Sequence, residues 1–288
     1  MVSEILKKIN ISGCENATVE QFKRSDDNSE YKVWKIDLNG KVYVLKKAKE
    51  YEAEVYSSFF ALDEIGAPKL ISTVFVEGDC YILMEYIEGR DICHCDRKLL
   101  IKALDALIYL QNKYWSNTDK ADIAFSFSKS LAHREARAQY LCDAELEGAY
   151  GHFLEKYKTL PRTFCHDDLL PFNIIVSDDK ATIIDWEIAG ILPYPTSFAR
   201  LIAHTEESND AFFYMSDEDK QFAINYYYEN LVKQHGISYK DYRETLDLFI
   251  FYEYCEWIML GNKYEDADMD MYSKYFKKAK EHLETIYC

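Results

Sequence analysis

Three polar side chains with oxygen donors are spaced around two short apolar runs. Asp168 and Asn173 precede the run 174–176, and Asp185 ends the next run. The polar segment 177–180 predicts the turn of a small β-hairpin, and closing it would bring the three side chains to one end. Carboxylate and amide oxygens with no basic residue among them suit a hard cation such as Mg²⁺. The pattern indicates a phosphoryl-transfer site, although Asp and Asn also commonly flank turns.

The same residues resemble the signature of a known family. The chain reads His166-x-Asp168-x-x-x-x-Asn173, with Ile-Asp185-Trp-Glu twelve residues later. This spacing resembles the catalytic loop and metal-binding Asp of the aminoglycoside phosphotransferase and choline kinase superfamily, small-molecule relatives of the protein kinases. The resemblance implies that Asp168 receives or orients the acceptor hydroxyl, and that Asn173 and Asp185 hold Mg²⁺ against nucleotide phosphates. We expect His166 to brace the loop rather than to titrate.

The segment before this motif predicts an antiparallel sheet. Its five expected strands are 18–23, 31–38, 41–47, 71–76 and 80–86. Asn39-Gly40 is a strong hairpin signal, because both residues accept the positive φ angles of a type I′ turn. The loop 24–30 stands where a kinase-like fold covers the phosphates. It has no glycine, so its contact with the phosphates stays open.

Lys46 and Glu52 are the candidates for holding the nucleotide phosphates. Strand parity alone does not choose between Lys46 and Lys47, and the resemblance selects Lys46 as the third-strand lysine. In the helix expected over 50–62, Glu52 lies on the apolar face. A carboxylate on an apolar face needs a partner. The resemblance supplies one, an ion pair with Lys46.

Residues 84–89 resemble the linker between the two lobes in this superfamily. The resemblance implies that backbone groups of Glu85, Tyr86 and Ile87 bind the edge of the nucleotide base. Because side chains take no part in that contact, the sequence does not distinguish ATP from GTP. The expected division of the chain is an N-terminal nucleotide-binding lobe, a hinge and a C-terminal catalytic and acceptor-binding lobe, at 1–84, 85–89 and 90–288.

Helices dominate the expected C-terminal lobe. They are predicted around 99–110, 129–148, 217–234, 239–260 and 266–286. One of them carries several aromatic residues and two acids: Phe249, Phe251, Tyr252, Tyr254, Trp257, Glu253 and Glu256. Acids would suit a polyamine sugar, and an aromatic cage would suit a quaternary ammonium through cation–π attraction. Aromatic residues more often fill a core, and we favour that interpretation.

One position departs from the family pattern. Ser197 stands where relatives often carry an Asp before a Leu-Ala pair. Without that carboxylate, the sequence does not indicate which side chain supports the neighbouring loop.

Composition narrows the class of partner. The chain has 288 residues, with 34 Lys plus Arg against 50 Asp plus Glu, a net charge of −16. That charge argues against nucleic acid and anionic membranes. It is compatible with a cationic ligand, although an acidic surface also simply favours solubility. Eight scattered cysteines and no signal peptide predict a reducing, cytoplasmic location. No zinc-type cysteine spacing and no obligate protein partner are evident.

These observations converge on one prediction. We expect an α+β, two-lobed protein-kinase-like fold, with a five-stranded sheet plus helix and a larger, mainly helical C-terminal lobe. The expected activity is Mg²⁺-dependent transfer of the γ-phosphoryl group of ATP or GTP to a small-molecule hydroxyl. An aminoglycoside-type antibiotic is the first acceptor, and choline, ethanolamine or another amino alcohol or sugar is the alternative. A protein kinase is disfavoured, since no Ala-Pro-Glu follows Asp185; a non-catalytic nucleotide-binding module is the remaining rival.

Overall fold

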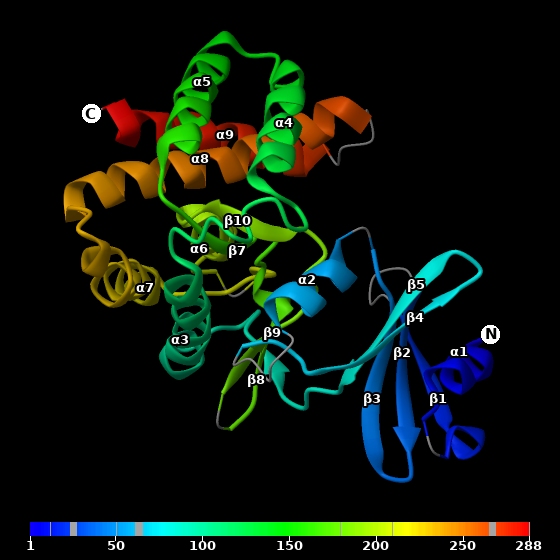
Figure 1. Ribbon diagram of the computed structural model, residues 1–288. Coiled ribbons are helices and arrows are strands. Elements are labelled where there is room, and N and C mark those ends of the chain that lie inside the picture. The colour runs from blue at the N-terminus through cyan, green and yellow to red at the C-terminus, as the bar shows by residue number, and fades with distance from the viewer. Residues whose placement is uncertain are drawn as a thin grey trace.

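Two lobes of unequal size make up the computed structural model (Figure 1). The smaller lobe is built on an antiparallel sheet, and the larger one is mainly helical, which confirms the expected fold class. The structure describes residues 1–11, 13–23, 28–49, 51–60, 66–178, 180–208, 210–264 and 269–287.

The N-terminal sheet has the strand order β1-β2-β3-β5-β4. Its strands are β1 (Thr18–Lys23), β2 (Glu30–Leu38), β3 (Lys41–Lys47), β4 (Leu70–Val76) and β5 (Asp79–Glu85). Asn39 and Gly40 both have positive φ, 56° and 84°, as the type I′ turn between β2 and β3 requires. Helix α1 (Val2–Ile9) packs Ile5 and Leu6 against one face of this sheet. The five predicted strands are therefore all present.

Helix α2 (Glu52–Phe59) connects the sheet to the C-terminal lobe. The ring of Phe59 stacks on Phe164 at 4.2 Å, and that of Phe60 packs on Trp186 at 4.8 Å. Because α2 shares the core of the larger lobe, its first residue is held in a fixed place between the lobes. Residues 50, 61 and 62 of the helix expected over 50–62 lie outside the described part of the chain.

Seven helices of the described residues form the C-terminal lobe. They are α3 (Arg97–Tyr114), α4 (Phe127–Arg137), α5 (Ala144–Thr159), α6 (Pro195–Ala203), α7 (Asp217–Asn230), α8 (Tyr239–Tyr264) and α9 (Met269–Tyr287). Short 3₁₀ helices occur at Cys14–Asn16, Ala138–Tyr140, Pro171–Asn173 and Val232–His235. Helices α5, α6 and α9 all pack against α8 (Figure 1).

The single helix predicted at 129–148 is wrong. Helix α4 ends at Arg137, and α5 begins only at Ala144. Cys142 has a left-handed φ of 55°, which a continuous helix does not allow. Asp143 then caps α5, because its Oδ1 accepts hydrogen bonds from the Glu145 and Leu146 amides at 3.1 and 3.0 Å.

Five short strands lie in the larger lobe among the residues that the structure describes. Strand β7 (Arg162–His166) pairs with β10 (Ala189–Pro193), and β8 (Ile174–Val176) pairs with both β6 (Arg90–Asp91) and β9 (Ala181–Ile183). The antiparallel pair β8–β9 is the hairpin predicted from the sequence.

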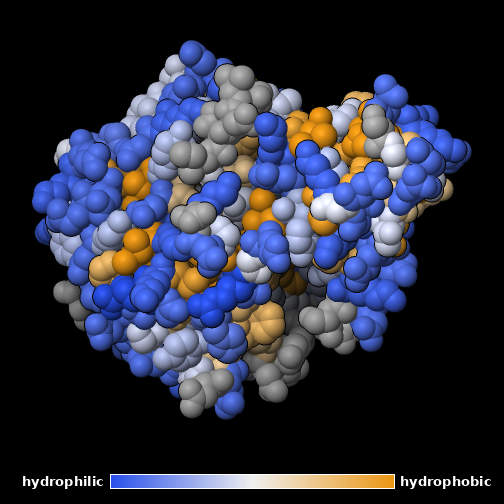
Figure 2. All heavy atoms as spheres, turned by 90° about the horizontal axis from the view of Figure 1, so that it is seen from below, coloured by the Kyte–Doolittle hydropathy of each residue, from blue (hydrophilic) through white to orange (hydrophobic). Residues whose placement is uncertain are grey.

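The surface between the lobes is hollowed on the face shown in Figure 2. Much of the surface on that face is hydrophilic, in keeping with the acidic composition. Within the described ranges, each helix is too short or too polar to cross a membrane.

Candidate active site

The open end of the β8–β9 hairpin brings two of the expected residues together. Ile174 pairs with Ile183, and the Ile184 amide then donates to Asn173 O at 2.9 Å. Asn173 and Asp185 therefore follow directly from paired backbone positions. Asp185 has a φ of 64°, a left-handed conformation that Asp accepts more readily than most residues.

Lys46 lies between two carboxylates from different lobes. Its Nζ is 2.8 Å from Glu52 Oε1 and 2.5 Å from Asp185 Oδ1. The expected ion pair with Glu52 is present. Lys47 instead pairs with Asp79 at 2.7 Å, at the end of the adjacent strand β5. The lysine selected by resemblance is therefore the one that faces the hairpin.

Burial and ion pairing shift the pKa values of Lys46, Glu52 and Asp185 in different directions. Burial raises the pKa of Glu52 to about 7, and Lys46 opposes that shift. Burial also acts to raise the pKa of Asp185, but Lys46 outweighs it and holds that pKa below its usual value. The pKa of Lys46 is raised, because the two carboxylates outweigh the effect of burial. One ammonium thus faces two carboxylates, an arrangement that attracts a further cation.

His166 organises the backbone beside Asp168. Its Nδ1 accepts a hydrogen bond from the Asp168 amide at 3.2 Å, so Nε2 carries the proton and donates to Ile184 O at 2.9 Å. Burial lowers the pKa of His166, which keeps the ring neutral near pH 7. Both ring nitrogens are engaged by the backbone, so the ring braces the loop.

Ser197 supports the same loop without a carboxylate. Its Oγ accepts a hydrogen bond from the His166 amide at 2.8 Å. The support left open by the sequence is therefore provided by a hydroxyl at the start of α6.

Asn173 and Asp185 present oxygen atoms that fit a hard cation. Asn173 Nδ2 donates to Asp168 O at 2.9 Å. The other polar atom of the amide, Oδ1, is therefore an acceptor that can bind a cation. Among the described residues, no group of three His, Cys, Asp or Glu could hold a metal unaided. Two protein oxygens are compatible with Mg²⁺, which commonly keeps several waters and binds substrate phosphates.

Asp168 is held on one side and open on the other. Arg200 of α6 donates to Asp168 Oδ1 from Nη2 at 2.7 Å and from Nε at 3.1 Å. Oδ2 has no hydrogen-bond partner in the described part of the chain, and the side chain is 33% exposed. One oxygen is therefore fixed while the other can accept a hydrogen bond from an incoming hydroxyl.

Arg200 also binds the two acids of α8. Its Nη1 lies 2.7 Å from both Glu253 Oε2 and Glu256 Oε2, and Arg137 binds the second oxygen of Glu256. Burial acts to raise the pKa of Glu256, but Arg200 and Arg137 outweigh it and lower that pKa to about 2. Neither acid remains a free carboxylate for a polyamine.

The aromatic residues of α8 follow the favoured interpretation. Phe249, Phe251 and Tyr252 are buried in the core, and Tyr252 stacks on Phe153 at 4.6 Å. Trp257 is partly buried and stacks on Tyr275 of α9 at 5.5 Å. The first three therefore do not form an open cage for a ligand.

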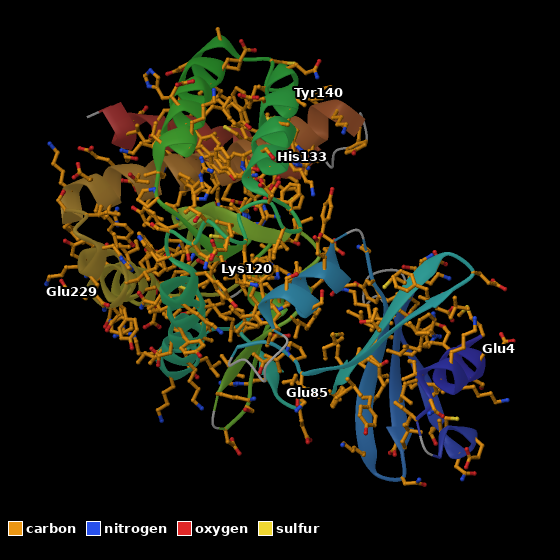
Figure 3. The ribbon with its side chains drawn as sticks, in the orientation of Figure 1. Glu4, Glu85, Lys120, His133, Tyr140 and Glu229 are labelled. Atoms are coloured by element: carbon orange, nitrogen blue, oxygen red, sulfur yellow. The ribbon has the colours of Figure 1, made fainter. Side chains whose placement is uncertain are left out.

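The expected linker begins within the sheet. Glu85 is the last residue of β5, where the sheet meets the larger lobe (Figure 3), and its amide donates to Lys69 O at 3.0 Å. The Tyr86 amide donates to Val42 O at 3.3 Å. Among the described residues, the Ile87 amide has no hydrogen-bond partner, so it is the available donor of the three. In the loop 24–30, residues 24–27 lie outside the described ranges.

Sequence reasoning missed Arg200. It pairs with residues 32 to 56 positions away, and no periodic pattern encodes such pairs. A signal was present, because Arg200 is a lone cation in the otherwise apolar segment 198–203. A cation on an apolar helix requires a buried partner.

Comparison with known proteins places these features in a family context. A family model described as "Phosphotransferase enzyme family" matches residues 18–226, more than half of the chain. Two curated proteins named Protein LicA, from Haemophilus influenzae, are 26% identical over 115 residues. The match covers 40% of this chain and 32% or 40% of those proteins, well under two thirds of their length.

Solved structures share the fold over nearly the whole chain. A choline/ethanolamine kinase family protein from Mesorhizobium loti has a TM-score of 0.66 at 15% identity, covering 98% of this chain and 95% of that one. A choline kinase from Cryptosporidium parvum gives 0.62 at 15%, covering 99% and 96%. A thermostable mutant of aminoglycoside phosphotransferase APH(4)-Ia, in ternary complex with ADP and hygromycin B, gives 0.61 at 14%, covering 98% of each chain.

Proposed function

Because the chain belongs to the phosphotransferase enzyme family, we propose that it transfers the γ-phosphoryl group of ATP or GTP to a small-molecule hydroxyl with the help of Mg²⁺. The observation that carries this proposal is the position of Lys46 between Glu52 and Asp185, beside a catalytic loop whose Asp168 keeps one oxygen open. Phosphoryl transfer requires a cation for the phosphates, a carboxylate that binds the metal and a group that accepts a hydrogen bond from the substrate hydroxyl. Lys46, Asp185 and Asp168 are the candidates for these three parts.

Each residue has a defined role in this proposal. Lys46 binds the nucleotide phosphates, and Glu52 fixes the direction of its side chain. Asn173 and Asp185 supply the protein oxygens for Mg²⁺, which when bound would neutralise charge on the phosphates. Asp168 accepts a hydrogen bond from the acceptor hydroxyl and directs it in line. His166 and Ser197 hold the loop and touch no reacting atom.

The linker supports binding of the nucleotide base by the backbone. The amides of Glu85 and Tyr86 already donate to the carbonyls of Lys69 and Val42, which leaves the Ile87 amide as the donor to the base edge. A backbone N–H group can donate to an acceptor atom of either adenine or guanine, so this contact does not select between ATP and GTP.

The acceptor is an amine-bearing small molecule, either an aminoglycoside-type antibiotic or an amino alcohol such as choline or ethanolamine. Glu253 and Glu256 are bound by Arg200 and Arg137, which weakens the case for a polycation at α8. Because Arg200 also binds Asp168, two guanidinium groups face three carboxylates, and this single excess negative charge favours a singly charged amino alcohol over a polycation. Antibiotic resistance would follow only from the aminoglycoside alternative.

Seven described cysteines carry free thiols, which supports the cytoplasmic location expected from the sequence. ATP, GTP and small metabolites are accessible in that compartment.

The test is a coupled ADP- and GDP-release assay with Mg²⁺. ATP or GTP is supplied with a panel of several aminoglycosides, choline, ethanolamine and simple sugars, and the Asp168→Ala variant serves as the blank. Turnover above the blank with one class supports the proposal and identifies the acceptor. Mg–nucleotide binding with no turnover on this panel or on a wider set of hydroxylated metabolites would favour the non-catalytic module. Phosphate incorporation into a panel of proteins would favour a protein kinase.

A further inference from the structure

Asp167, the neighbour of Asp168, has a buried carboxylate with a charged partner of its own. Its carboxylate is 8% exposed and is bound at two points by Arg134 of α4, with Nη2 2.5 Å from Oδ1 and Nη1 3.1 Å from Oδ2. The Arg134 side chain is itself only 1% exposed. A buried pair of charged groups that no step of the proposed reaction uses thus involves the loop residue next to Asp168.

Arg134 is held rigidly from several sides. Its guanidinium lies over the rings of Tyr157 and Tyr252, 4.8 and 4.7 Å from their centroids. Nη1 also contacts Ser130 Oγ, which is 2.8 Å from the Tyr157 hydroxyl. The Arg134 carbonyl accepts a hydrogen bond from the Tyr150 hydroxyl at 3.0 Å. The guanidinium therefore presents its fork to Asp167 in one orientation.

Stability alone does not explain a buried pair of this kind. Removing two charges from water is costly, and apolar residues of similar volume are often as stabilising as a buried ion pair. A two-point fork does supply direction, because both oxygens of the carboxylate are fixed in one plane. Fixing the Asp167 side chain fixes the backbone from which Asp168 projects.

The two adjacent aspartates are thus each restrained by an arginine of a different helix. Asp167 is bound by Arg134 of α4, and Asp168 is bound by Arg200 of α6. We propose that Arg134 and Asp167 form a positioning pair that fixes the catalytic-loop backbone so that Asp168 faces the acceptor hydroxyl. This inference rests on the proposed function, since its main consequence is a rate. Neither residue of the pair touches a reacting atom.

The decisive variant removes both charges together. Arg134→Met with Asp167→Leu leaves no unpaired charge, so the melting temperature is expected to stay within a few degrees of wild type. The kcat should fall about tenfold or more, because a small displacement of Asp168 is costly to the rate. The KM for nucleotide should change less than about twofold, since Lys46, Glu52 and Asp185 are untouched. A folded double variant with wild-type kcat would overturn the proposal.

A conservative variant covers the case in which the double variant does not fold. Arg134→Lys keeps the charge but loses the two-point fork. It is expected to lower kcat while the melting temperature stays near wild type, and an unchanged kcat would overturn the positioning role.

Backbone amide exchange separates failure of the pair from failure of the proposed function. The amides of Asp168, Leu170 and Asn173 donate hydrogen bonds within the loop, to His166 Nδ1, Asp168 O and Leu170 O. We expect these loop amides to exchange faster in the double variant than in wild type. If only Arg134→Lys folds, the same increase is expected there. The amides of α3 should exchange at the wild-type rate. If the wild type phosphorylates no acceptor, the proposed function fails, and this exchange alone decides the pair. Unchanged amide exchange in the loop would then overturn the positioning role of the Arg134–Asp167 pair.

Discussion

Arg200 binds Asp168 through two nitrogens on a single oxygen, Nη2 at 2.7 Å and Nε at 3.1 Å from Oδ1. The same guanidinium reaches both acids of α8, so one side chain ties the candidate catalytic loop to that helix. The consequence is a carboxylate with a fixed direction and one open oxygen.

Replacing Arg200 with lysine tests this link. A single ammonium cannot hold Asp168 and the α8 acids in the same geometry as a planar fork. We expect Arg200→Lys to lower kcat by about 10- to 100-fold, with the KM for nucleotide unchanged. Steady-state kinetics measure both values. Arg97→Lys is a matched control, because Arg97 also binds two acids, Glu218 and Asp219, without contacting Asp168. Equal losses in both variants would argue against a specific role of Arg200.

Asp185 should set the Mg²⁺ requirement. Asp185→Asn removes the charge while leaving Lys46 paired with Glu52, so the fold should remain and the Mg²⁺ concentration for half-maximal rate should rise about tenfold or more. Initial rates over a MgCl₂ series at fixed nucleotide give this value. Asp178→Asn, an exposed residue at the turn of the same hairpin, is the control and should match wild type. An identical Mg²⁺ dependence in Asp185→Asn would contradict its role as a ligand.

The raised pKa of Glu52 makes the free energy of unfolding decrease as the pH rises. Its pKa is raised from 4.5 to about 7, so the folded state binds the proton more tightly than the unfolded state. This contribution to the free energy of unfolding is fully present below about pH 4.5 and is lost as the pH rises through 7. Glu52→Gln does not titrate. Wild type should therefore lose stability relative to Glu52→Gln between pH 5 and 8, as thermal unfolding at each pH would measure. A constant difference would refute the shift.

The local parts of the site could be predicted from the sequence. The strands beside Asn39 and Gly40 follow from alternation and from a turn that needs positive φ. The β8–β9 hairpin follows from two apolar runs around a polar turn, and it places Asn173 and Asp185 without knowledge of the rest of the chain. Glu52 was placed by helical period alone. Such features depend on contacts between residues that are close in sequence.

Other parts depend on contacts that sequence patterns do not encode. The break between α4 and α5 uses a left-handed Cys142, a residue type that rarely adopts that conformation. The pairs Arg134–Asp167 and Arg200–Asp168 join segments 33 and 32 residues apart. The pairing of Glu253 and Glu256 with arginines is likewise visible only once α4, α6 and α8 are packed together.

The central claim is that Asp168 directs an acceptor hydroxyl beside a bound Mg–nucleotide. The most direct measurement is turnover of wild type and Asp168→Ala with the best acceptor of the panel, together with Mg–nucleotide affinity and melting temperature for both. We predict that Asp168→Ala loses most of the turnover while nucleotide affinity and melting temperature stay near wild type, because Lys46 and Asp185 keep their contacts. Equal turnover in the two proteins would contradict the role of Asp168 and the mechanism built on it.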